Sequence, residues 1–577
     1  MASAEARLDV ITIGRSSVDL YGQQIGSRLE DIASFAKSVG GCPSNIAIGA
    51  ARLGLKSGLI TRVGDEQMGR FIREQMAREG VALDGIVTDP QRLTSLVLLS
   101  VVNDRTFPLI FYRENCADSA LCEDDIDPAF ISAARAVLVT GTHFARPLND
   151  HAQRKAVGIA RRNGLKVVLD IDYRPNLWGL AGHAAGEERY IKSDRVSEHL
   201  QSILPDCDLI VGTEEEVHIA GAAEETLTAL RTIRSLTSAT LVLKRGPMGC
   251  VVFPAEIPER IEDGIVGKGF PIEVYNVLGA GDAFMAGFLR GWLRGEPLET
   301  CATWANACGA FAVSRLLCSP EIPTFEELQF FLEHGSPYRA LRKDEAINNI
   351  HWATTRRPAP PHLLILGLDH ALDAVAAIQA IGRLAAGQSG FGVLLDDRHG
   401  PEALFEARSS GLWIGRLLEI QDSQDIGSKL IEWPVTHTVR YRVSADPEER
   451  DMAGAVFDAA RRIGRELMIE VVAGSEPADE AVDRLYGTGI KPDWWALPAP
   501  AVLSRSIGEI ISARDPHCRG IIATGSATMP FEAAAGAPFV RGFALEGPID
   551  HPTVDKMASH FQSFVDLWQK ARDRKAA

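Results

Sequence analysis

Seven residues near the middle of the chain combine the features that phosphoryl transfer requires. The run is Asn276-Val277-Leu278-Gly279-Ala280-Gly281-Asp282, and an apolar, helix-like run follows it at once. Two glycines one residue apart at a helix start let backbone N–H groups approach an anion, and the helix dipole adds positive potential there. The Asp282 carboxylate can take the proton of a hydroxyl that attacks a phosphate. The pattern predicts an anion hole at Gly279, Ala280 and Gly281 beside a general base; an ordinary tight turn capped by Asp is the alternative.

This turn resembles the second signature of the ribokinase-type sugar kinases, the phosphofructokinase-B superfamily, whose usual form is D-T-x-G-A-G-D. Gly279 to Asp282 match it, whereas Asn276 and Val277 stand where the family has Asp and Thr. The resemblance implies ATP and Mg²⁺ as cofactors. In relatives the side of the motif that differs here, at Asn276 and Val277, often helps to hold a monovalent cation. Potassium is therefore a possible cofactor, and whether the protein requires it stays open.

Several residues upstream are candidates for binding a sugar. Asp19 follows the first buried strand-like run, 8–14, at a place where ligands of α/β sheets gather, although a turn-capping Asp is an even alternative. Gly40-Gly41-Cys42-Pro43-Ser44-Asn45 opens a helix and resembles the first family signature, G-G-x-x-x-N. That resemblance implies that Gly40 and Gly41 admit the sugar and that Asn45 contacts its hydroxyls.

Two arginines are candidates for the anionic end of a substrate. Arg113 follows the second of two β-rich runs, 95–102 and 106–112, which we expect to form a hairpin. The resemblance implies that these strands form a small lid over the sugar. Arg174 lies in Asp170-Ile171-Asp172-Tyr173-Arg174-Pro175-Asn176-Leu177-Trp178, which resembles a D-x-N-x-R-x-x-x-W segment of kinases that act on keto-deoxy sugar acids. Guanidinium groups suit carboxylates, but a solvated arginine is an equal alternative for Arg113.

The nucleotide side is predicted from three further segments. The run 241–250 resembles the strand and glycine turn that flank ATP in the family, which implicates Lys244, Gly246 and Gly249, and Asn306 is a candidate for adenine contact. Glu216 occupies the Glu of the family's N-x-x-E motif, with Thr213 in place of Asn, and the resemblance implies that it acts on magnesium through water. Acidic residues that favour a helix N-terminus explain the same glutamates without catalysis.

The order of the elements predicts an α/β chain with two domains. Strands and helices alternate through the first half, which favours a parallel sheet. The resemblance implies that this sheet is ribokinase-like, with a small β lid, and that the domain covers residues 1–334. Residues 335–361 are polar and proline-bearing, as linkers are. Residues 362–577 contain eight strand-like runs, each followed by a helical or loop segment, which predicts a (β/α)₈ barrel; a doubly wound sheet is the alternative.

The second half resembles an aldolase-like domain found fused to bacterial sugar-acid kinases, whose distant relatives are lysine Schiff-base aldolases. The lysines borne by strands in those aldolases fall here on Arg440 and Ala496. The lysines after the linker, at 429, 491, 556, 570 and 575, lie outside the predicted strands. Arginine stays protonated and forms no imine, so we predict that the barrel is not a Schiff-base aldolase. Glu419 and Glu470 remain as a buried carboxylate pair, and the barrel's ligand stays open.

Composition limits the classes of partner. The chain has 577 residues, 46% of them hydrophobic, with a net charge of -16, which opposes binding to nucleic acids or anionic membranes. The N-terminus lacks an apolar targeting segment, and the nine cysteines show no C-x-x-C pair, so we expect a cytoplasmic protein with reduced thiols. We also expect a homo-oligomer that binds only small molecules.

Taken together, the resemblances imply an ATP-dependent kinase that phosphorylates the terminal hydroxyl of a keto-deoxy sugar acid. Kinases for 5-dehydro-2-deoxygluconate, an intermediate of inositol breakdown, have similar segments at 17–21 and 112–115 and a similar fused barrel. A kinase for 2-dehydro-3-deoxygluconate, a bifunctional kinase–aldolase and a sugar- and nucleotide-binding scaffold are the alternatives.

Overall fold

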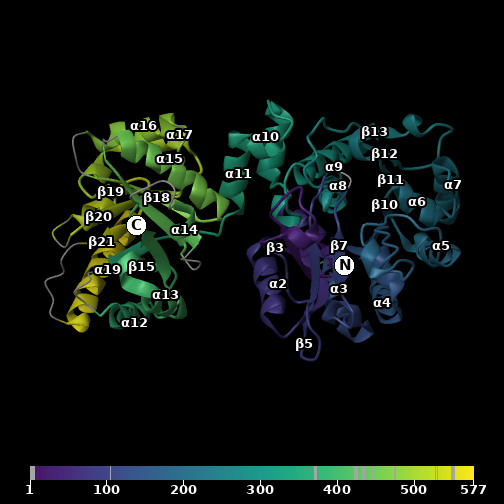
Figure 1. Cartoon of the computed structure of the whole chain (residues 1–577), viewed down its shortest axis with the longest axis horizontal. Helices are drawn as coiled ribbons and strands as arrows, with labels where there is room; N and C mark the ends of the chain where they lie inside the picture. Colours follow the sequence, from purple (N-terminus) through teal and green to yellow (C-terminus); the bar gives the residue numbers. More distant parts are fainter. Residues whose placement is uncertain are drawn as a thin grey trace. The chain divides into compact units, whose positions relative to one another are not determined.

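The computed structural model describes residues 7–103, 106–368, 373–420, 426–431, 436–444, 447–472, 476–526, 528, 530–546 and 553–576. The chain divides into two compact units, Met1–Thr355 and Arg356–Ala577. Each unit is a layered α/β structure with its own core (Figure 1).

A nine-stranded sheet forms the centre of the first unit. Its strand order is β13-β12-β11-β10-β9-β8-β1-β4-β5, from the top to the bottom of that unit in Figure 1. The seven strands from β5 to β11 run parallel, and β12 and β13 add antiparallel at one edge. Their bounds are β1 Leu8–Ile13, β4 Ser57–Gly64, β5 Ile86–Asp89, β8 Ala134–Thr140, β9 Lys166–Asp170, β10 Leu209–Thr213, β11 Thr240–Lys244, β12 Cys250–Phe253 and β13 Ile265–Gly267.

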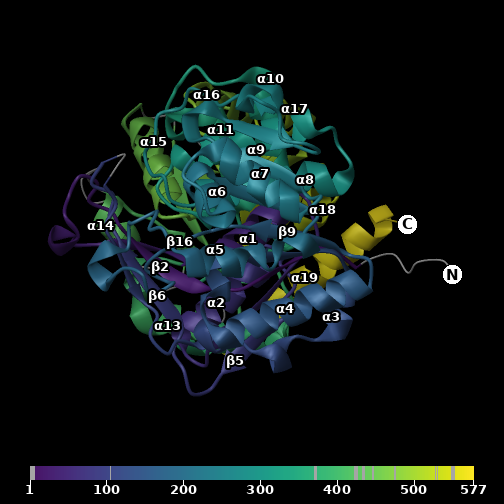
Figure 2. The same ribbon diagram turned by 90° about the vertical axis from the view of Figure 1, so that its right-hand side faces the viewer.

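Helices cover both faces of this sheet, as its continuous apolar strands require. On one face α4 to α7 pack through one large core, and Figure 2 shows this side of the unit toward the viewer. On the other face α1, α8 and α9 pack through a second core, with α2 nearer the β5 edge. The short α3 belongs to the first face, because its Phe130 and Ile131 join the core of α4 to α7. The helices are α1 Cys42–Arg52, α2 Gln67–Arg78, α3 Pro128–Ser132, α4 Pro147–Arg162, α5 Asp194–Gln201, α6 Glu214–Gly221, α7 Thr226–Leu236, α8 Ala280–Arg294 and α9 Leu298–Val313.

The lid is a separate four-stranded sheet with the order β3-β2-β6-β7. The expected hairpin is present as β6 Ser95–Leu99 and β7 Leu109–Tyr112, which pair antiparallel. The sequence analysis did not place β2 Ser17–Gly22 and β3 Phe35–Gly40 in this sheet. Asp19 therefore lies on a lid strand.

The first part of the expected linker is structured. Residues 341–343 form a 3₁₀ turn, and α11 Glu345–Thr355 packs beside α10 Phe325–His334. The buried Ile347 and an ion pair of 2.7 Å between His351 Nδ1 and Glu327 Oε2 attach α11 to the first unit. The expected linker was therefore too long. Its sequence is mostly polar, but Ile347 packs in the core of the first unit and His351 pairs with the buried Glu327.

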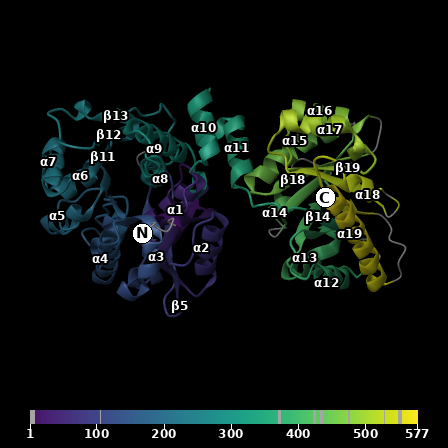
Figure 3. The ribbon, with the colours of Figure 1, turned by 180° about the vertical axis from the view of Figure 1, so that it is seen from behind.

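The second unit is the expected barrel, closed in the order β14 to β21 (Figure 3). Its strands are β14 Leu363–Gly367, β15 Phe391–Leu395, β16 Trp413–Leu417, β17 Thr438–Val443, β18 Glu466–Val471, β19 Trp494–Pro498, β20 Gly520–Gly525 and β21 Val540–Leu545. The surrounding helices are α12 Ala374–Ala385, α13 Gly400–Ser409, α14 Ile426–Ile431, α15 Pro447–Arg462, α16 Ala478–Gly487, α17 Arg505–Arg514, α18 Phe531–Ala535 and α19 Val554–Ala576. Closure rules out the doubly wound alternative.

Among the helices in the described part of the chain, none is both long and apolar enough to cross a membrane.

Candidate phosphoryl-transfer site

One large pocket in the first unit gathers most of the predicted residues. Its volume is about 680 Å³, and it lies where β9, β10 and β11 end, between the lid strands and the start of α8. Parallel strands place their carboxyl ends at one edge of a sheet, which is where ligands of such folds bind. The predicted residues that line it are Asp19, Gly41, Asn45, Arg174, Glu216, Lys244, Gly246, Gly249, Gly279, Ala280, Gly281, Asp282 and Asn306.

The turn before α8 has the geometry of an anion hole. Gly279 is the N-cap residue with φ 80°, and a Cβ there would lie 2.5 Å from Cys318 Sγ, so both conformation and space require glycine. A Cβ on Gly281 would lie 3.3 Å from Lys244 Nζ. The first amides of a helix of fifteen residues and a lysine ammonium therefore meet at one place, where negative charge is stabilised.

Asp282 is partly buried and oriented by a hydrogen bond from Asn45. Its Oδ2 accepts a hydrogen bond of 2.7 Å from Asn45 Nδ2. Burial raises the pKa of Asp282, and the bond from Asn45 opposes that shift without cancelling it. Asn45 Oδ1 is buried and accepts no hydrogen bond from a described residue, so it can accept one from a hydroxyl group.

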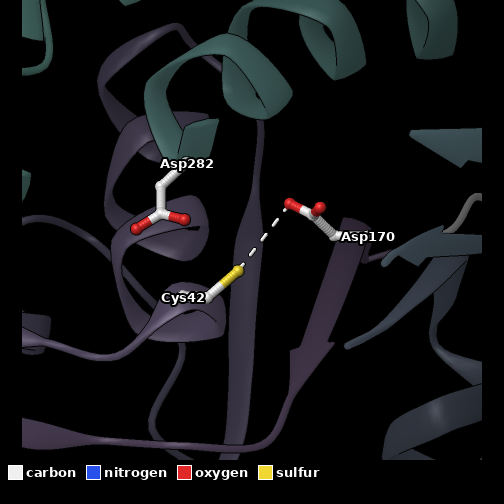
Figure 4. A group of neighbouring side chains, drawn as sticks. All are labelled: Cys42, Asp170 and Asp282. Carbon is white, nitrogen blue, oxygen red and sulfur yellow. Dashed lines mark hydrogen bonds between the residues drawn. The ribbon is translucent and has the colours of Figure 1, made fainter. Parts of the chain in front are cut away.

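Figure 4 shows that Asp282, Cys42 and Asp170 converge from the starts of α8 and α1 and the end of β9. One ligand atom from each of the three lies within 4.8 Å of the others, and Cys42 Sγ lies 3.7 Å from Asp170 Oδ2. Burial raises the pKa of the Cys42 thiol well above its usual value. The thiol is therefore a neutral neighbour of the two carboxylates.

Lys244 connects the end of β11 to two acidic side chains. Its Nζ lies 3.4 Å from Asp170 Oδ1 and 3.4 Å from Glu216 Oε2, and all three side chains are buried. Burial raises the pKa of Asp170 to about 7, although Lys244 acts against that rise. Burial would also raise the pKa of Glu216, but Lys244, Arg174 and the Thr213 amide hold it below its usual value.

Glu216 has a structural role as well as a place in the pocket. Its Oε2 accepts a hydrogen bond of 2.7 Å from the Thr213 amide, and Thr213 Oγ1 accepts one from the Glu216 amide, which forms a capping box at the start of α6. Both interpretations of this glutamate from the sequence are compatible with this geometry.

Gly40 and Gly41, the two glycines before α1, lie very close to neighbouring atoms. A Cβ on Gly40 would lie 2.0 Å from Asp19 Oδ2, and a Cβ on Gly41, which has φ 96°, would lie 2.5 Å from the Arg15 carbonyl oxygen. Gly40 does not line the pocket but leaves room for Asp19, which does. Burial raises the pKa of Asp19 to about 6, and Ser17 donates a hydrogen bond of 2.7 Å to its Oδ1.

The structure differs from the expectation for Arg113. This side chain is outside the pocket lining, and its guanidinium forms an ion pair with the fully buried Asp118. Ser95 also donates to Asp118, so this network joins the lid strands to the following turn. Arg113 therefore supports the lid, because the nearby carboxylate of Asp118 already neutralises it.

Two other arginines occupy the pocket with Arg174, and the sequence analysis missed both. Arg15 follows β1 directly and donates to Asp172 Oδ2 at 3.0 Å, and its position at a strand end was an available signal. Arg189 lies in a segment without periodicity and gave no signal. The positive charge of the nearby Arg174, together with burial, lowers the pKa of Arg189 to about 9.

The residues expected to contact the nucleotide also line this pocket. Gly246 has φ 54°, and a Cβ on Gly249 would lie 2.0 Å from the Gly267 carbonyl oxygen, so the turn after β11 depends on these glycines. Asn306 Nδ2 donates to the Lys268 carbonyl at 3.2 Å. The Asn306 amide nitrogen thus fixes the loop after β13, and its oxygen is the atom left for a ligand.

Asn276, which departs from the family motif, braces the anion-hole turn. Its Nδ2 donates to the Leu316 carbonyl at 2.6 Å, and its Oδ1 accepts from the Leu278 amide at 3.0 Å. A neutral amide therefore makes both contacts, and the position supplies no carboxylate to a cation.

The barrel strands contain no lysine. Arg440 is fully buried on β17, 2.9 Å from Glu470 Oε2 and 2.5 Å from Glu546 Oε1. Ala496 is buried on β19. The expected buried pair of Glu419 and Glu470 is wrong, because the Glu419 side chain is 62% exposed and Glu470 instead pairs with Arg440.

Comparison with known proteins assigns each unit to a sequence family. Residues 7–324 match the model of the pfkB family of carbohydrate kinases, and residues 327–572 match DUF2090, an uncharacterised protein family conserved in bacteria.

Similar curated proteins are 5-dehydro-2-deoxygluconokinases. That of Geobacillus kaustophilus is 33% identical over 341 residues, which cover 58% of this chain and 97% of the relative. Those of Geobacillus thermodenitrificans and Listeria monocytogenes serotype 4b are 32% and 30% identical, and each alignment covers 96% of the relative.

Solved structures agree on the fold. A putative ribokinase II from E. coli superposes with a TM-score of 0.51 at 22% identity, covering 56% of this chain and 99% of that chain. The same protein solved with ATP and Mg²⁺ gives a TM-score of 0.50 at 21% identity, with the same coverage. Because the family match spans residues 7–324, more than half of the chain, and signature residues line one pocket, the chain belongs to the pfkB family of carbohydrate kinases.

Proposed function

We propose that the first unit transfers the γ-phosphoryl group of ATP to the terminal hydroxyl of 5-dehydro-2-deoxygluconate. The observation that carries this proposal is the place of Asp282, which lies between the anion-hole turn and Asn45 in a pocket that also holds Arg15, Arg174 and Arg189. A base, an anion hole and a cationic wall in one pocket suit the phosphorylation of an acidic sugar.

Asp282 removes the proton of the attacking hydroxyl. Asn45 holds one carboxylate oxygen at 2.7 Å, which leaves the other oxygen for the hydroxyl, and the unpaired Oδ1 of Asn45 accepts from a neighbouring hydroxyl of the sugar. The raised pKa of Asp282 makes it a better proton acceptor than an exposed aspartate.

The anion hole and Lys244 stabilise the charge of the transferred group. The amides at Gly279 to Gly281 point from the start of α8, and Lys244 Nζ lies beside Gly281. Magnesium would supply positive charge that offsets the negative charge of the phosphate groups. Its preference for oxygen ligands fits the carboxylates of this pocket, and we assign Glu216 to hold it through water, as part of this proposal.

The arginines give the preference for an acid. Asp172 lies 3.0 Å from Arg15 and 3.7 Å from Arg174, so it is shared between them. Repulsion by Arg174 is the largest cause of the lowered pKa of Arg189. A carboxylate placed between them relieves that repulsion and forms charge-assisted hydrogen bonds. The names of the curated relatives then favour 5-dehydro-2-deoxygluconate among acidic sugars.

A coupled assay of ADP release tests this proposal. We expect kcat/KM for 5-dehydro-2-deoxygluconate to exceed that for 2-dehydro-3-deoxygluconate, and both to exceed that for neutral fructose by at least about a hundredfold, since each hydrogen bond from an arginine to a carboxylate contributes about 1.5–3 kcal/mol. Equal values for acidic and neutral sugars would refute the role of the arginines. A higher value for 2-dehydro-3-deoxygluconate would keep the kinase and replace the substrate.

For the barrel we propose that no Schiff-base aldolase activity is present. Each strand of the barrel lacks lysine, and the two positions where the resemblance places it carry Arg440, which is locked between two glutamates, and the apolar Ala496. An imine requires a neutral amine on a strand, which this arrangement does not provide.

A further inference from the structure

A second pocket lies at the amino-terminal end of the barrel strands. His362 directly precedes β14, Trp494 begins β19, Arg519 directly precedes β20, and Arg541 is the second residue of β21. Arg572 from α19 and residues 359–361 complete the lining, and the cavity volume is about 420 Å³. Active sites of such barrels form at the opposite, carboxyl-terminal end of the strands, so this pocket is separate from the usual location.

The pocket is cationic at its base. Arg519 is 2.7 Å from Glu466 Oε1, and only 8% of its side chain is exposed, so this arginine is buried and neutralised. Both carboxylate oxygens of Glu466 have a partner, because the second one accepts a hydrogen bond of 2.7 Å from Trp494 Nε1. Arg541 and Arg572 have no carboxylate partner among the described residues, and Arg572 donates only to the Ala535 carbonyl at 3.3 Å. Two positive charges therefore remain at the mouth of the pocket.

The surroundings do not supply the missing negative charge. Burial and the nearby Arg572 and Arg541 lower the pKa of His362. On the same end of the barrel, burial with Arg357 and Arg465 lowers the pKa of His437 to about 4. Both imidazoles thus experience positive potential. After burial, the cause common to both shifts is the positive charge of nearby arginines.

We propose that this pocket binds the phosphate group of a small molecule. Two guanidinium groups without carboxylate partners match the two charges of a phosphate dianion, whereas a single carboxylate would leave one of them unneutralised. The volume lies in the range of small-ligand sites, and the floor is rigid because Trp494 is buried and the Arg519 side chain is held by Glu466. The ligand is either free phosphate or a phosphate monoester, which share this chemistry.

Calorimetric titration of the full chain tests the proposal, with inorganic phosphate and glucose 6-phosphate as probes at matched ionic strength. The variant Arg541→Gln/Arg572→Gln removes the two unpaired charges and leaves the first unit unchanged, so phosphate bound at the kinase site cancels in the comparison. We expect the double variant to lose one binding event, with affinity reduced at least about tenfold for each arginine. Tighter binding of glucose 6-phosphate than of phosphate would identify a monoester as the ligand; the reverse would identify the free ion.

The matched control is Arg408→Gln/Arg505→Gln, which changes the net charge equally. Both of these arginines are exposed on helices of the same unit, and neither forms an ion pair with another described residue. The control should bind both probes like the parent chain. Equal isotherms for the parent and the double variant, or equal losses in the double variant and the control, would overturn the proposal. If the double variant does not fold, Arg541→Gln alone, at an exposed side chain, gives the same comparison with about tenfold expected loss.

Discussion

Replacement of Asp282 by Asn separates the proton-accepting role of this residue from its structural one. The substitution keeps the shape of the side chain, and its amide oxygen can still accept the hydrogen bond that Asn45 donates at 2.7 Å. Only the ability to take a proton is lost. General bases contribute about 10²- to 10⁴-fold to rate, so we expect kcat to fall about 10³-fold, which is about 4 kcal/mol in the activation free energy.

The assay is initial-rate ADP release at saturating ATP and sugar acid, with ATP affinity measured separately. Nucleotide affinity should change less than threefold, since the anion-hole amides and Lys244 remain in place. Asp282→Ala should be less stable than Asp282→Asn by about 1–3 kcal/mol, because it leaves both polar atoms of the buried Asn45 without a partner.

Asp9→Asn is the matched control. Asp9 is also a buried aspartate of this unit, at the start of β1, with Arg135 at 3.2 Å and Arg294 at 3.4 Å. Its loss should lower the melting temperature and leave kcat within about twofold, since ion pairs away from the pocket affect stability alone. A folded Asp282→Asn enzyme that keeps kcat within tenfold of the parent would refute the role of Asp282 as the base.

Four further predictions follow from the pocket and the barrel. Burial raises the pKa of Asp19 in the folded protein from 3.8 to about 6, so between these values the folded state holds a proton that the unfolded chain has released. The protein therefore gains stability through this group as the pH falls through 6. Asp19→Asn should raise the melting temperature at pH 7.5 and leave it nearly unchanged near pH 4. Lys244→Met leaves Asp170 and Glu216 buried without their cation, and it should reduce the free energy of unfolding by about 3–5 kcal/mol in denaturant titrations. Because Asn276 supplies no carboxylate, exchange of potassium for sodium at constant ionic strength should change kcat less than threefold, and a larger activation would show a cation site formed without it. Borohydride reduction of the full chain with dihydroxyacetone phosphate should add no mass to peptides of residues 362–577, whereas a trapped adduct would establish imine chemistry in the barrel.

The sequence predicted well whatever depends on local pattern. The turn at Gly279 to Asp282 was identifiable because a required positive φ, two close amides and a helix start all lie within four residues. The eight barrel strands were likewise predicted from apolar runs, and each corresponds to a strand of the closed ring.

The predictions failed where the outcome depends on a partner that is distant or unmarked. Arg113 looked available for a substrate, but it pairs with Asp118, whose burial depends on the packing of the lid. Arg15 follows a strand end, which was a signal, but its partner Asp172 lies 157 residues away and could not be found from spacing. The polar segment before the barrel contains α11, because Glu327 from the preceding helix provides a buried anion for His351. Such pairings are set by tertiary contacts, which residue spacing does not encode.

The most direct test of the account is identification of the product formed from ATP and 5-dehydro-2-deoxygluconate by the intact chain. Phosphorus NMR should show one phosphate monoester, formed in equal amount to ADP and coupled to the protons of the terminal CH₂ group. That result would establish a sugar-acid kinase that acts on the terminal hydroxyl. Release of inorganic phosphate without a monoester, or a monoester on another hydroxyl, would contradict the proposed placement of the substrate between Asp282 and the arginines.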